Sequence, residues 1–177
     1  VDTVAGAGVS VFYIHGRKAW LNGLSPKENR TIPPLDYERV RRLAKRRGDL
    51  TVILNGGLVS ADQALAEMIG CDGVMIGRAA YRTPYILAEA AQHIFARVPP
   101  QRENVALAMA EYADSMTQNG AQLHNITRHM LGLYAGQSGA KYWRRQLGEH
   151  ARAATRPGDF IRETSAFCEA LSVRRAA

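Results

Sequence analysis

Two glycine-containing segments, each directly after a short apolar run, carry residues that could bind a phosphate group. Asn55-Gly56-Gly57 follows residues 51–54, and Gly77-Arg78 follows residues 73–76. Glycine at a strand end lets backbone N–H groups approach an anion without a Cβ in the way, and arginine adds a fixed charge. Asn55 could hydrogen-bond a ring or ribitol group, or hold the turn. The pair predicts a phosphate-bearing ligand such as flavin mononucleotide, a phosphosugar or a phosphorylated biosynthetic intermediate.

A third segment, residues 15–30, follows the apolar run of residues 9–14 and is basic and rich in turn residues. It begins with His15 and contains Trp20, Lys27 and Arg30. A loop that leaves a strand with such side chains usually binds a ligand. We therefore expect this loop to face both a cofactor and a polyanion.

The positive charge of the chain is concentrated in two places. The net charge is +7, and residues 17–47 alone hold ten basic and three acidic side chains. A second cluster contains Lys141, Arg144, Arg145, Arg152 and Arg156 against Glu149. Two basic patches beside a cofactor-type core favour an RNA or DNA partner. Arg39, Arg42 and Arg46 recur at helical spacing, so they could equally form a solvated helix face.

The first half of the sequence alternates strand and helix patterns. A helix end near residues 6–8 precedes strands predicted at 9–14, 51–54 and 73–76. Asp36 can cap a helix that runs to about Arg47 and ends at Gly48, and Ser60 can cap a helix over 61–69, with Gln63 completing a capping box. A further helix follows Pro84. Alternating strands and helices predict a parallel sheet, and three strands fit the C-terminal part of a (β/α)₈ TIM barrel in an α/β protein.

The pattern changes after Val98-Pro99-Pro100, where strand signals stop. Helices are predicted over about 102–119, 123–135, 139–153 and 157–172, with Pro157-Gly158 separating the last two. We therefore predict two domains. Residues 1–97 form the C-terminal part of a barrel, and residues 98–177 form a small all-helical domain.

Composition and residue spacing indicate the cellular compartment of the protein and whether it binds a metal. No apolar run approaches the ~20 residues of a membrane span, and there is no signal-peptide pattern. Cys71 and Cys168 lie far apart without metal-ligand spacing, and His124 and His129 are five residues apart, so we expect no metal site and a cytoplasmic protein. The sequence lacks an initiator Met and opens like the middle of a helix, which is typical of a fragment.

Several segments, in the same order along the chain, closely resemble the tRNA-dihydrouridine synthases of the A-type subfamily. These are residues 15–30 with 33–35, residues 54–57 with 72–81, and residues 127–133 with 139–145. The resemblance implies an FMN-containing barrel followed by a helical domain that binds tRNA. It also implies reduction of a uridine at position 20 or 20a of the tRNA D-loop to 5,6-dihydrouridine, with NADPH as reductant. Such chemistry needs a cofactor because no side chain donates a hydride.

The resemblance also implies roles for individual residues. His15, Asn55, Gly56, Gly57, Gly77 and Arg78 match the positions that bind the flavin and its phosphate. Lys27, Arg30, Lys141 and Arg144 match positions that contact tRNA. The family usually has arginine at the position of Lys141. Lysine at this position replaces the planar guanidinium by a single point charge. We expect tRNA as the partner, no membrane and no metal, and a monomer.

The catalytic cysteine of the family, and the glutamine and lysine that contact its flavin ring, have no counterpart in this sequence. Cys71 and Cys168 do not match that position, and we expect both to be small core residues. The sequence taken alone is therefore expected to bind flavin poorly and not to complete the reaction. Two alternatives remain: another FMN or phosphosugar barrel that shares only the glycine loops, or a non-catalytic RNA-binding remnant.

Overall fold

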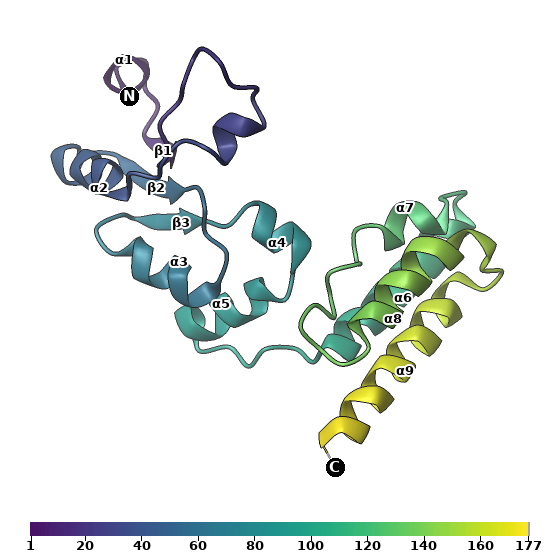
Figure 1. The fold of residues 1–177 in the computed structure, drawn as a ribbon. Coiled ribbons are helices and arrows are strands. Elements are labelled where there is room, and N and C mark those ends of the chain that lie inside the picture. The colour runs from purple at the N-terminus through teal and green to yellow at the C-terminus, as the bar shows by residue number, and fades with distance from the viewer. Residues whose placement is uncertain (177) are drawn as a thin grey trace. The chain divides into compact units, whose positions relative to one another are not determined.

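The computed structural model describes residues 1–176 of the chain, and the side chains of residues 1–174. The chain divides into two compact units, one comprising Val1–Ala80 and the other beginning at Tyr81 (Figure 1). Each unit has its own hydrophobic core. The division falls within α4 (Arg78–Arg82). The predicted domain boundary between residues 97 and 98 stays a prediction, because a compact unit need not coincide with a domain of a longer protein.

The first unit is built on a three-stranded parallel sheet in the order β1-β2-β3. In this register Val11 lies opposite Thr51, and Ile53 lies opposite Gly73. The elements of this unit before α4 are α1 (Asp2–Ala5), β1 (Val11–His15), η1 (Glu28–Arg30), α2 (Tyr37–Arg46), β2 (Thr51–Asn55), α3 (Ala61–Met68) and β3 (Gly73–Met75). The alternation of strands and helices and the parallel sheet are confirmed.

The sheet buries one face and exposes the other. On the buried face, Val52 and Leu54 of β2 pack with Val40 of α2 and Ala64 of α3. On the opposite face, Tyr13 is 64% exposed and Met75 is 41% exposed. Burial of alternate residues on one face is the pattern of a sheet covered by helices on that side.

Side-chain N-caps fix where α2 and α3, the helices that pack on the sheet, begin. The Asp36 side chain accepts a hydrogen bond from the Arg39 N–H, and the Ser60 side chain accepts one from the Gln63 N–H. The Gln63 side chain accepts from the Val59 N–H at 2.9 Å, one residue before the cap. Both predicted N-caps are confirmed, because a cap depends only on neighbours within one turn.

The second unit is helical, with its core between α6 and α9. Small residues on α6, Ala106, Ala110 and Ala113, are fully buried in the same core as Ile161 and Cys168 of α9. The elements after α4 are α5 (Ile86–Phe95), α6 (Arg102–Gln118), α7 (Leu123–Thr127), α8 (Ala140–Arg145), the π-helical turn η2 (Gln146–His150), the 3₁₀ turn η3 (Ala151–Ala153) and α9 (Pro157–Ala176). No strand occurs in this unit among the described residues, as the sequence predicts.

Several predicted bounds were wrong. The helix expected over 123–135 ends at Thr127, and hydrogen-bonded turns follow it. Within these turns Gly132 lies so close to the Arg82 carbonyl that an added Cβ would be 1.8 Å from that oxygen. The helix expected over 139–153 changes after Arg145 into η2 and η3.

At the start of the chain, β1 begins at Val11 rather than at residue 9, because the ladder with β2 begins at the pair Val11–Thr51. The helix α2 ends at Arg46, with Arg47 rather than Gly48 as its C-cap. Pro157 and Gly158 are the first residues of α9. Proline suits that position because the first helical N–H has no intrahelical partner.

Candidate functional site

The carboxyl ends of the three strands bring the predicted phosphate-binding residues to one edge of the sheet. His15 ends β1 opposite Asn55, which ends β2 and lies opposite Met75 of β3. Gly56 and Gly57 continue directly from β2, and Gly77 and Arg78 begin two residues after β3. Ligands of open α/β sheets bind outside the carboxyl ends of the strands. The edge therefore presents both predicted glycine loops together with His15.

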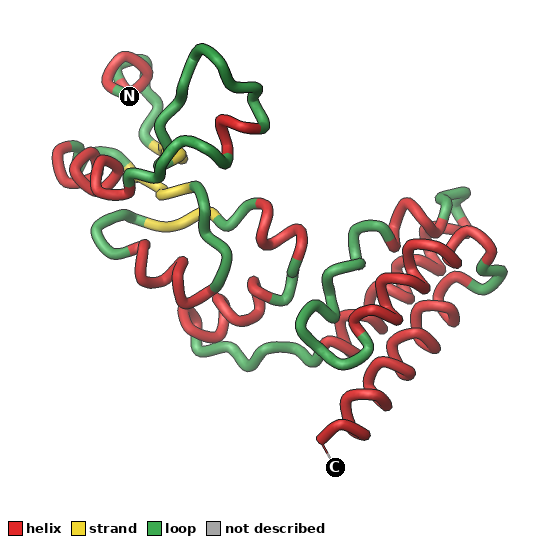
Figure 2. Tube along the Cα trace, viewed as in Figure 1, coloured by secondary structure: helices red, strands yellow, loops and turns green. Residues whose placement is uncertain are grey.

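The loop after β1 returns to its own starting point. Figure 2 shows it as a long loop, with the short helical turn η1 in it, between β1 and α2. Arg17 forms an antiparallel bridge with Leu35, and its guanidinium donates to the carbonyl oxygens of Thr31 (3.1 Å) and Pro33. This guanidinium closes the base of the loop. Sequence reasoning missed that role for Arg17, because its partners lie 14 and 16 residues away.

Further contacts brace the loop internally. The Asn29 side chain accepts from the Trp20 N–H and donates to the Trp20 carbonyl, each at 2.9 Å. Glu28 accepts from the backbone N–H and the hydroxyl of Ser25. The side chains of Lys27 and Arg30 are exposed on this braced frame. The loop therefore holds its two predicted RNA-binding cations on an ordered support.

His15 lies in a strongly positive environment. Burial lowers the pKa of His15, and the guanidinium groups of Arg17, Arg78 and Arg30 lower it further. Arg78 also donates from Nη2 to the Arg30 carbonyl oxygen at 3.1 Å. Arg30, predicted to bind tRNA, is thus brought beside the predicted phosphate-binding Arg78. Clustered guanidinium groups favour a bound anion.

The glycines after β2 are required by close packing and by their backbone angles. An added Cβ at Gly56, where φ is +115°, would lie 2.9 Å from Cε1 of His15. An added Cβ at Gly57, where φ is +73°, would lie 2.5 Å from Cδ1 of Leu35. Gly77 has no neighbouring atom within 4 Å of such a Cβ and is exposed. The missing side chains of Gly56 and Gly57 therefore leave room for neighbouring residues of the chain, whereas the backbone at Gly77 is open to a ligand such as the phosphate of FMN.

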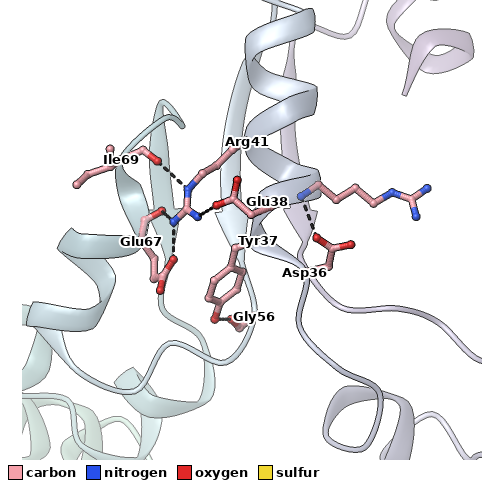
Figure 3. Close-up of polar contacts among 8 residues, drawn as sticks. Asp36, Tyr37, Glu38, Arg41, Gly56, Glu67 and Ile69 are labelled. Atoms are coloured by element: carbon pink, nitrogen blue, oxygen red, sulfur yellow. Dashed lines mark hydrogen bonds and ion pairs between the residues drawn. The ribbon is translucent and has the colours of Figure 1, made fainter.

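Tyr37 is a site residue that sequence reasoning missed. Its hydroxyl donates to the Gly56 carbonyl oxygen at 2.6 Å (Figure 3). Tyr37 is the first residue of α2, directly after the Asp36 cap. A tyrosine directly after a helix cap gives no signal that its hydroxyl will contact a loop 19 residues later.

In the second unit, two predicted RNA-binding cations share a solvent-exposed side of α8. Lys141 and Arg144 are exposed and three residues apart, which places them on one helix face. Trp143 between them is fully buried and donates from its indole N–H to the Met130 carbonyl at 2.8 Å. The buried tryptophan therefore anchors α8 with its two cations toward solvent.

Neither cysteine has the environment of an activated nucleophile. Burial raises the pKa of the Cys168 thiol to about 11, and its sulfur lies in the core of the helical unit. Burial also raises the pKa of Cys71, which packs against the core of the first unit. A reactive cysteine instead needs a lowered pKa. Among the described residues, no group of histidine, cysteine and acidic side chains could hold a metal ion, and no helix is long and apolar enough to cross a membrane.

Comparison with known proteins identifies the family of the chain. A family model described as "Dihydrouridine synthase" matches residues 1–171. A tRNA-dihydrouridine(20/20a) synthase of Shewanella oneidensis is 48% identical over 153 residues, which are 85% of this chain and 46% of that protein. Its counterpart in Salmonella typhimurium is 49% identical over 157 residues, 87% of this chain and 47% of that protein. The chain thus spans about half the length of the curated relatives it matches.

Proposed function

This chain belongs to the dihydrouridine synthase family, and on that basis we propose that it forms the C-terminal part of a tRNA-dihydrouridine(20/20a) synthase. The first unit then contributes the last strands of a (β/α)₈ barrel, and the helical unit binds tRNA. The observation that carries the proposal is the sheet edge where His15, among three arginines, lies against the glycine loop after β2. An alternative phosphosugar barrel would leave the basic loop and the cations of α8 without a purpose.

FMN fits this edge because the exposed backbone at Gly77 is open to a phosphate and Arg78 supplies a positive charge. In this proposal Asn55, Gly56, Gly57, Gly77 and Arg78 hold the phosphate end. His15, beside the guanidinium groups of Arg17, Arg78 and Arg30, hydrogen-bonds the cofactor through its imidazole ring. When bound, FMN supplies the hydride that reduces the C5–C6 double bond of uridine, and NADPH is the reductant.

The tRNA is held by exposed cations on both units. Lys27 and Arg30 lie on the loop after β1, and Lys141 and Arg144 lie on α8. Their contacts are to phosphates, which position an RNA without reading its sequence. The reacting carbons of a stacked uridine are shielded, so the substrate base must leave its stack to reach the cofactor. We place the protein in the cytoplasm as a monomer, where it would meet tRNA.

Replacing Lys27 and Arg30 together by alanine tests the RNA-binding part of this proposal. A phosphate that no cation neutralises keeps its counterions when the protein binds. The tRNA binding should therefore weaken, and its salt dependence should flatten by roughly 1.5 units of log–log slope. The measurement is filter binding of tRNA over a range of salt concentrations.

The matched control replaces Arg42 and Lys45, two exposed cations of α2, by alanine. It removes the same charge from the same unit, but from α2 instead of from the loop. An unchanged slope in the Lys27 and Arg30 variant, or an equal loss in the control, would contradict the assignment.

A further inference from the structure

Tyr37 lies between the backbone that follows β1 and the glycine loop that follows β2. An added Cβ at Gly16, directly after β1, would lie 2.9 Å from Cδ1 of the tyrosine ring. An added Cβ at Gly57 would lie 3.1 Å from its hydroxyl oxygen. The tyrosine is therefore in close contact with the loop ends that follow both β1 and β2.

The hydroxyl of Tyr37 fixes the orientation of one peptide plane. It donates to the carbonyl oxygen of Gly56 at 2.6 Å. In a planar trans peptide the carbonyl and the following N–H point in opposite directions. The Gly57 N–H therefore points away from Tyr37, and among the described residues it donates to no backbone acceptor. An N–H held in this way is available to a ligand.

The helix that carries Tyr37 is itself held at several points. The Arg41 guanidinium pairs with Glu38, one turn earlier on α2, and with Glu67 of α3 at 2.5 Å. Its Nε also donates to the Ile69 carbonyl oxygen at 2.9 Å. Figure 3 shows Arg41 bridging from α2 to the end of α3 while Tyr37 points to Gly56. The helix α2 is thereby tied both to the loop after β2 and to the end of α3.

The tyrosine keeps its proton under ordinary conditions. Burial and the carboxylate of Glu67 raise the pKa of Tyr37 above its usual value, although Arg17 and Arg41 oppose the shift. A phenol with a raised pKa remains a hydrogen-bond donor throughout the neutral range. The contact to Gly56 therefore persists at any pH at which the protein would work.

From these contacts we infer that Tyr37 is a positioning residue that presents the Gly57 N–H to the phosphate of the bound cofactor. It acts through the loop backbone and does not touch the ligand itself. The inference rests on the proposed function, because that function supplies the phosphate-bearing ligand. It goes further because it names one group, the Tyr37 hydroxyl, that fixes the orientation of the peptide between Gly56 and Gly57.

The test is the variant Tyr37→Phe, which removes only that hydroxyl. The ¹⁵N-labelled chain is titrated with FMN and, separately, with riboflavin, which lacks the phosphate, and the amide signals of Gly56 and Gly57 are followed. Amide shifts detect weak binding, so the chain can be used as it stands. We expect the dissociation constant for FMN to rise about three- to ten-fold in Tyr37→Phe, because one neutral hydrogen bond is removed. Riboflavin should bind the two proteins equally.

The matched control is Tyr112→Phe, which removes a hydroxyl from an exposed tyrosine of α6. It should behave as the unsubstituted chain. An unchanged FMN dissociation constant in Tyr37→Phe, or an equal loss for riboflavin, would overturn the positioning role while leaving the phosphate site intact. If the Gly57 amide of the unsubstituted chain responds no more to FMN than to riboflavin, the proposed phosphate site itself is wrong, and the positioning role is overturned with it.

Discussion

At the level of single residues, His15 is the side chain whose chemistry depends most on its surroundings. A histidine far from other charges would be partly charged near neutral pH. Here partial burial and three guanidinium groups disfavour the charged form. The same guanidinium groups would attract an anion. The pKa of His15 should therefore change when an anion binds at the sheet edge.

The titration of His15 should show this coupling. In phosphate-free buffer its NMR midpoint should fall below 6.5, the ordinary value, because its pKa is lowered in the folded protein. The unfolded chain then binds more protons over this window, so stability should fall as the pH drops from about 6.5 through the folded pKa. Adding inorganic phosphate should raise the midpoint, because an anion offsets the arginines.

The variant Arg78→Gln serves as the internal check on this prediction. It removes one of the three guanidinium charges and should raise the His15 midpoint even without phosphate. A midpoint at or above 6.5 in the unsubstituted chain would contradict the arrangement around His15. So would a midpoint that phosphate leaves unmoved.

At the level of elements, α6 and α9 are joined by one carboxylate. Asp114 of α6 accepts from the backbone N–H of Gly158 at 2.7 Å and from Nη2 of Arg162 at 3.0 Å. Gly158 is buried in the first turn of α9, where backbone N–H groups lack intrahelical partners. Asp114 therefore caps α9 from another helix, and the negative charge also complements the positive helix end.

Replacing Asp114 by alanine should destabilise the helical unit. The buried Gly158 N–H would be left without its acceptor, at a cost of about 1–3 kcal/mol. Urea unfolding, followed by the fluorescence of the buried Trp143, measures the change in this unit. The control Glu111→Ala removes an exposed carboxylate from the same helix and should change the free energy of unfolding by less than about 0.5 kcal/mol. Equal stability of the two variants would rule out a capping role for Asp114.

At the level of the whole molecule, the residues proposed to bind the cofactor lie in one compact unit, and those proposed to bind tRNA lie in both. The first unit has the cofactor-type sheet edge and the cations Lys27 and Arg30, and the second has Lys141 and Arg144. Each pair is held in place by contacts within its own unit. Lys27 and Arg30 lie on the loop braced by Asn29, and Lys141 and Arg144 lie on α8, which Trp143 anchors. A polyanion that needs both pairs must therefore contact both units.

Replacing Lys141 and Arg144 together by alanine should weaken tRNA binding and flatten its salt dependence by roughly 1.5 units of slope. Filter binding at several salt concentrations measures both quantities. The charge-preserving pair Lys141→Arg and Arg144→Lys should keep the slope, because each cation still neutralises a phosphate. If the alanine variant keeps the full slope, α8 does not bind the RNA.

Local features of the sequence predicted much of this structure. Asp36 and Ser60 cap their helices as expected, because a cap involves residues within one turn. The glycine loops after β2 and β3 lie at one sheet edge, because parallel strands bring their carboxyl ends together. The predicted roles of these loops in FMN binding, and of the cations in tRNA binding, stay predictions.

The amino-acid sequence by itself determined the alternation of strands and helices, the helix caps, the glycine loops and the family. Only the tertiary structure decided that Arg30 lies beside Arg78 and that Tyr37 holds the Gly56 carbonyl. It also decided that the predicted helix beyond Thr127 gives way to turns, where Gly132 packs against the Arg82 carbonyl. The physical reason is the same in each case. Contacts between residues 19 to 50 positions apart depend on how whole elements pack, and no local pattern records that packing.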